Sequence, residues 1–92
     1  MKLHYRWDAD VIFIEEKPDG NDYEFRIRLL QAAHMGAMRK IQLFFESNDV
    51  FTDVFFYTYP ENEYRVIVRH DFYADFVLAL MRHQLLQSVE WK

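Results

Sequence analysis

Cysteine is absent from the 92-residue sequence, and glycine and proline occur only twice each. Without cysteine there can be no disulfide, thiolate nucleophile or cysteine-ligated metal centre, and a reducing compartment, the cytoplasm by default, is expected. With only Gly20 and Gly36, the chain has neither a glycine-rich phosphate loop nor a Gly-x-Ser-x-Gly turn. Because 51% of the residues are hydrophobic, a disordered or low-complexity chain is excluded as well.

Long apolar runs are also missing. The longest, residues 76–81, has six residues, far short of the roughly 20 that span a bilayer, and the first residues lack the apolar core of a signal peptide. No membrane association is expected. A chain of this length has room for one hydrophobic core, which predicts a single domain over residues 1–92. The net charge of −4 argues against a general nucleic-acid binder but leaves room for a local basic face.

Aromatic residues are present in excess. Nine Phe, six Tyr and two Trp make up 18% of the chain. So small a domain has little interior for them, and large apolar groups left at a surface usually mark an interface. This surplus is the first indication of self-association or of a protein partner.

The second half of the chain predicts a hairpin followed by a helix. Residues 54–59 and 64–69 are rich in β-branched and aromatic residues and flank a turn at 60–63. Asp71 is then expected to cap a helix over residues 72–87, which contain no glycine or proline. That helix is apolar over more than one stripe, so it should contact something on two sides. Residues 88–92 fit either a short strand or a frayed tail.

The first half follows the same plan. Residues 11–14 and 23–28 bracket a turn at 17–21 and predict another hairpin. Over residues 30–46 apolar side chains recur at three- and four-residue spacing, which favours a helix ended by Ser47, Asn48 and Asp49. A strand at the end of this segment, with Ile41, Leu43 and Phe45 on one face, is the alternative. Residues 2–8 are a candidate edge strand.

Together these elements predict an α+β fold in ββαββα order. The antiparallel sheet would have about four strands, or five or six with the terminal segments, and both helices would cover one face. Residues 23–28 match 64–69, Pro18 matches Pro60, and the pairs Met-Arg at 38–39 and 81–82 match in order. Internal duplication and a chance similarity of two ββα units both fit, because the identities are few.

Alternation along the strands assigns two sheet faces. Tyr23, Phe25 and Ile27 would meet the helices, as would the even positions of 64–68. The opposite face would then display four arginines: Arg26, Arg28, Arg65 and Arg69. Arginines beside aromatic rings suit single-stranded nucleic acid or another polyanion, because they neutralise phosphate while the rings stack on bases. The alternative is that these arginines are solvated and pair with glutamates on neighbouring strands.

Catalytic or metal-binding patterns are not apparent. The four histidines include no pair at the i, i+4 spacing of a helical metal site. His70 and Asp71 are adjacent, but neighbours in sequence rarely face each other, and helix capping explains Asp71 more simply. Neither Ser47 nor Ser88 has a His-Asp pair nearby in sequence. We therefore expect no metal and no cofactor, and nothing positive points to an enzyme.

The expected function is a non-enzymatic protein-interaction module that acts as a homodimer or docks on a protein partner. Polyanion binding through the arginine face is the alternative. An interface is expected for two reasons. Residues 54–57 would be apolar on both faces of a strand, and the second predicted helix has a broad apolar surface. The interface candidates from these segments are Phe55, Phe56, Tyr57, Tyr73 and Leu78.

Overall fold

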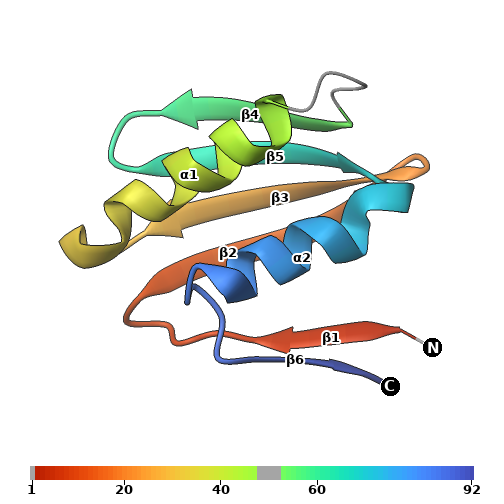
Figure 1. Ribbon diagram of the computed structural model, residues 1–92, viewed down its shortest axis with the longest axis horizontal. Helices are drawn as coiled ribbons and strands as arrows, with labels where there is room; N and C mark the ends of the chain where they lie inside the picture. Colours follow the sequence, from red (N-terminus) through yellow and green to blue (C-terminus); the bar gives the residue numbers. More distant parts are fainter. Residues whose placement is uncertain (1, 48–52) are drawn as a thin grey trace.

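The computed structural model describes residues 2–47 and 53–92, and within them it contains six strands and two helices. Four strands form an antiparallel sheet in the order β2-β3-β5-β4, and both helices lie over the same face (Figure 1). These strands are β2 (Ile12–Asp19), β3 (Asp22–Leu29), β4 (Val54–Tyr59) and β5 (Glu63–Arg69). The predicted α+β class and antiparallel sheet are confirmed.

Both hairpin turns contain fewer residues than the sequence predicted. Asp19 pairs with Asp22, so only Gly20 and Asn21 form the first turn, and Gly20 takes a φ of +62° that suits glycine. In the second turn Glu61 and Asn62 also have positive φ, 64° and 60°. The first turn was expected over 17–21, but β2 continues through Pro18 to Asp19, because a proline is tolerated where a strand lies at the sheet edge.

The two ββα units are arranged symmetrically. Strands β3 and β5 lie at the centre of the sheet and β2 and β4 at its edges. Phe25 pairs with Val66, the residue to which the match between 23–28 and 64–69 makes it equivalent. An approximate twofold axis normal to the sheet therefore passes near this pair. The arrangement suits an internal duplication, which stays an interpretation.

Helix α1 (Met35–Glu46) begins later than the predicted residue 30, after a short 3₁₀ helix, η1 (Ala32–His34). The reason lies in the backbone of Leu30, whose N–H donates to the carbonyl of Val11 at 3.0 Å and so extends the hairpin instead.

The strand considered for the end of this segment is wrong, because residues 41–45 are helical. Ile41 is fully buried while Leu43 is exposed, although a strand would have placed them on one face. The hydroxyl of Ser47 donates to the carbonyl of Phe44 at the helix end. Asn48 and Asp49, also expected to end the helix, lie outside the described residues.

Helix α2 (Tyr73–Arg82) is shorter than the predicted 72–87 and follows a second 3₁₀ helix, η2 (His70–Phe72). The expected cap by Asp71 is wrong: neither helical segment has a side-chain cap hydrogen bond. Instead Asp71 Oδ1 lies 2.8 Å from Nε2 of His70, so these neighbours do face each other.

The other end of α2 is set by Gln84, whose φ of 63° cannot continue a right-handed helix. Leu85 and Leu86, which were predicted to be helical, follow this break and are buried in the core. The segment therefore turns back under the helix rather than extending it.

The terminal strands β1 (Leu3–Arg6) and β6 (Ser88–Trp91) pair with each other in a separate two-stranded ribbon. The alternative of a main sheet widened to five or six strands is therefore wrong, and that sheet has the predicted four strands. A single oxygen, Oε1 of Glu16 on β2, accepts hydrogen bonds from Tyr5 at 2.7 Å and Tyr73 at 2.8 Å. Because Glu16 faces the helix layer, these bonds hold the ribbon beside α2 and not at the edge of β2 (Figure 1).

The core lies between the sheet and the helices, as alternation predicted. Of the strand residues predicted to face the helices, Phe25, Ile27, Val66 and Val68 are fully buried, and Tyr23 is half-buried. Phe76 and Leu80 of α2 are fully buried against them. No helix in residues 2–47 and 53–92 is long and apolar enough to cross a membrane.

Candidate functional site

The sheet face that the helices leave uncovered carries the four predicted arginines, Arg26, Arg28, Arg65 and Arg69, on the two central strands. Arg26 lies directly opposite Arg65 across the β3–β5 ladder. Like charges facing each other across a ladder are unfavourable unless other groups compensate them. The compensation comes from carboxylates on the same face.

Three of these arginines have acidic partners. The pairs are Arg65 with Glu24, Arg28 with Glu61 at 3.1 Å, and Arg69 with Asp53 at 3.5 Å. For Arg26 the described part of the chain offers no ion pair. The uncovered face is therefore a mosaic of both charges rather than a basic surface.

Glu24 is the unexpected member of this mosaic. It lies on the uncovered face yet is only 5% exposed, because Arg65 and Lys17 from the two flanking strands close over it. Their hydrogen bonds, that of Arg65 foremost, hold the pKa of Glu24 below its ordinary value. Glu24 on β3 thus links β2 and β5 through its ion pairs with Lys17 and Arg65. The Arg65 guanidinium also lies 5.6 Å from the centre of the Tyr57 ring, so it is already engaged by two neighbours.

The five predicted interface residues do not form one surface. Phe55 and Tyr57 lie on the uncovered sheet face opposite Ile67 and Arg65, while Phe56 points to the helix side and contacts Phe76. The remaining two lie on α2: Tyr73 is half-buried against Tyr23, and Leu78 is exposed.

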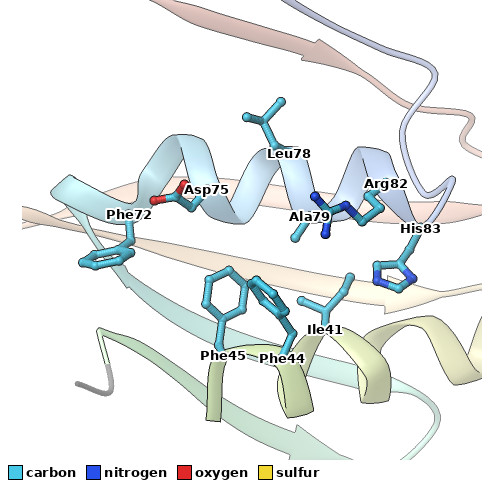
Figure 2. Close-up of a pocket in the computed structure, with 9 residues that line it drawn as sticks. All are labelled: Ile41, Phe44, Phe45, Phe72, Asp75, Leu78, Ala79, Arg82 and His83. Atoms are coloured by element: carbon cyan, nitrogen blue, oxygen red, sulfur yellow. The ribbon is translucent and has the colours of Figure 1, made fainter. Parts of the chain in front are cut away.

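A groove opens between the two helices on the opposite side of the molecule (Figure 2). We call it the interhelix groove. Its cavity measures about 340 Å³, and its lining is Ile41, Phe44, Phe45, Phe72, Asp75, Leu78, Ala79, Arg82 and His83. Beneath it, the rings of Phe45 and Phe76 lie 6.2 Å apart, centre to centre, so the floor is aromatic and firmly packed.

The groove exposes two large apolar side chains to solvent. Phe44 is 59% exposed and Leu78 50% exposed. Phe44 stands on α1 with its ring edge-on to Phe45, 5.2 Å away, and Leu78 projects from α2 (Figure 2). Leu78 points away from α1 in this view, so the two exposed side chains stand on different sides of α2 (Figure 2). Large exposed apolar side chains gathered near one groove are typical of interaction sites.

The polar residues of the groove come from the two ends of α2. Asp75 lies toward Phe72, while Arg82 and His83 come from the far end, and the Arg82 side chain extends back toward Ala79 (Figure 2). Asp75 and His83 are eight residues apart, about 12 Å along the helix axis, too far for a carboxylate to orient an imidazole. The groove therefore offers apolar contact flanked by opposite charges from the first and last turns of α2, and its carboxylate and imidazole do not adjoin each other.

No three His, Asp or Glu side chains in the described ranges are placed to hold a metal ion. His70 and Asp71 form an exposed pair at the surface, with side chains 63% and 75% exposed.

Comparison with known proteins finds no matching family model, no matching curated protein and no matching solved structure. The site must therefore be interpreted from its geometry. Sequence reasoning identified Leu78 but missed Phe44, Asp75 and Arg82. The available signal was the spacing of Asp75, Leu78 and Arg82 on one helix stripe, with charges only at its ends.

Proposed function

We propose that the protein is a non-enzymatic interaction module that binds another polypeptide through the interhelix groove. The observation that carries this proposal is the exposure of Phe44 and Leu78 beside a packed aromatic floor. Fully burying a Leu or Phe side chain contributes about 1.5–3 kcal/mol. A partner that covers both groups therefore gains binding free energy without any rearrangement of the core.

The chemistry of the groove favours this function over catalysis. Its polar members, Asp75, Arg82 and His83, stand at opposite ends with apolar groups between them. Such a site suits an amphipathic segment whose charges match those ends. The proposal includes a cytoplasmic setting, with which a chain free of cysteine is compatible.

Polyanion binding on the uncovered sheet face is the second candidate. Its support is Arg26, which has no ion pair among the described residues and adjoins a cavity lined by Tyr59 and Arg65. The carboxylates on the same face weaken it. Titration of a labelled mixed-sequence oligonucleotide at low salt tests it, because real binding would weaken with salt and with Arg26→Ala. A flat titration removes this candidate.

The groove is tested by site-specific photo-crosslinking. A benzophenone amino acid replaces Phe44, and a matched variant carries it at Phe13, an aromatic residue 49% exposed on the uncovered sheet face. Both variants are illuminated as purified protein and in a lysate of the source organism. We expect polypeptide adducts from position 44 and none from position 13.

Leu78→Asp supplies the second arm, because it places a charge in the groove at a position that is already exposed. Circular dichroism should show an unchanged fold, while the adducts from position 44 should be lost. Absence of adducts from position 44, or equal adducts from position 13, would refute the proposal.

A further inference from the structure

The outer stripe of α2 is complementary to itself. Asp75, Leu78 and Arg82 stand at positions i, i+3 and i+7, so they lie on one side of the helix, and all are exposed. In residues 2–47 and 53–92 neither Asp75 nor Arg82 has an ion-pair partner. Between them, residues 76–81 are all uncharged. The stripe thus begins with a negative charge, ends with a positive one and is apolar at its centre.

We propose that the polypeptide bound at the interhelix groove is a second copy of this chain, docked with its α2 antiparallel to the first. A twofold axis near Leu78 and Ala79 would bring Asp75 of each copy opposite Arg82 of the other. This inference rests on the proposed function, and it names the partner.

Helix geometry makes both ion pairs form together. Asp75 and Arg82 are separated by seven residues, about 10.5 Å along the helix axis, and the separation is the same in both copies. A parallel arrangement would instead put Asp75 opposite Asp75 and Arg82 opposite Arg82. An alternative explanation of these charges is the dipole of α2, which favours a negative charge near its start and a positive charge near its end. The dipole does not explain why the residues between the two charges are apolar.

Leu78 occupies the centre of the stripe, and Ala79 next to it is small. Packed helices lie about 8–10 Å apart, at a distance set by the side chains between them. The helix layer covers the broad face of a molecule whose Cα extents are 31 × 31 × 22 Å. A stable interface takes about 800 Å² from each partner, which fits on this face and would include Phe44 and Leu78.

Charge exchange tests this geometry. Asp75→Arg leaves both positions positive and Arg82→Asp leaves both negative, so each variant alone should repel itself. Sedimentation equilibrium should show a wild-type dimer, with twice the 11.3 kDa chain mass, and at least about tenfold weaker dimerisation for either variant. An equimolar mixture of the two variants should dimerise again, as should the double variant Asp75→Arg/Arg82→Asp.

Asp19→Arg and Arg26→Asp are the matched controls, since they change the same charges on exposed residues of the uncovered sheet face. Recovery in the mixture also shows that both variants are folded. If Asp75→Arg and Arg82→Asp dimerised as strongly as the wild type, the antiparallel geometry would be refuted. A monomeric wild type that still yields adducts from position 44 would overturn self-docking and leave the groove function standing, whereas a monomer without adducts would overturn both.

Discussion

Removal of the Glu16 carboxylate should detach the terminal ribbon from the rest of the fold. Oε1 of Glu16 accepts the hydroxyl protons of Tyr5 and Tyr73 at 2.7 and 2.8 Å, and these bonds join β1, β2 and α2. A hydrogen bond to a charged group contributes about 1.5–3 kcal/mol. Since Glu16 is only half-buried, the lower value applies to each bond, and Glu16→Ala should destabilise the protein by about 3 kcal/mol.

The two tryptophans make this loss observable. Trp91 lies in β6 and Trp7 follows β1 directly, so tryptophan fluorescence reports on the ribbon while far-ultraviolet circular dichroism reports on the whole fold. In urea, Glu16→Ala should lose its fluorescence signal before its dichroism signal. Glu15→Ala, a neighbour whose side chain is exposed on the other sheet face, is the control and should change stability by less than about 0.5 kcal/mol.

A double-mutant cycle gives the decisive comparison. Tyr5→Phe should cost about 1–1.5 kcal/mol in the wild type but little in Glu16→Ala, because the acceptor is already gone. Equal costs in both backgrounds would refute the shared hydrogen bond as the source of the stability.

Three further predictions concern the core and the titrating groups. Leu80→Ala removes a fully buried side chain and should cost about 2–4 kcal/mol in urea denaturation; less than about 0.5 kcal/mol would contradict the assigned core. The pKa of Glu24 lies below its ordinary 4.5 in the folded protein, so its stabilisation is complete above that pH and lost below it. Glu24→Gln should therefore lose less stability than the wild type between about pH 5 and pH 3; equal losses would contradict this. Burial and the Glu16 carboxylate raise the pKa of Tyr5 and Tyr73 well above 10, so their stabilisation is present below pH 10 and declines above it. Absorbance titration should show a late phase that Tyr5→Phe and Tyr73→Phe each reduce.

Features with a local origin could be predicted from the sequence. Alternation placed Phe25 and Val66 in the core and the arginines on the opposite face, because side-chain direction in a strand depends only on neighbouring residues. Turn residues located both hairpins within a few positions for the same reason.

Features that depend on distant residues could not be predicted. The pairing of residues 3–6 with 88–91 spans the chain, and the burial of Glu24 requires Lys17 and Arg65 from two other strands. The end of α2 depends on the left-handed backbone of Gln84, and a glutamine in the sequence does not predict that conformation. The interhelix groove depends on the spacing between helices, so only Leu78 of the five interface candidates lines it.

The ribbon also determines how this domain can be connected to other chains. The N–H of Lys2 donates to the carbonyl of Lys92 at 2.6 Å, and the N–H of Lys92 donates to the carbonyl of Lys2 at 2.8 Å. Residues 2 and 92 are therefore direct neighbours, and a short linker can join them without disturbing the fold. New ends opened at Gly20 and Asn21 would give a circular permutant with the same strand order. A host protein could likewise carry the domain as an insertion that leaves and re-enters its chain at a single point.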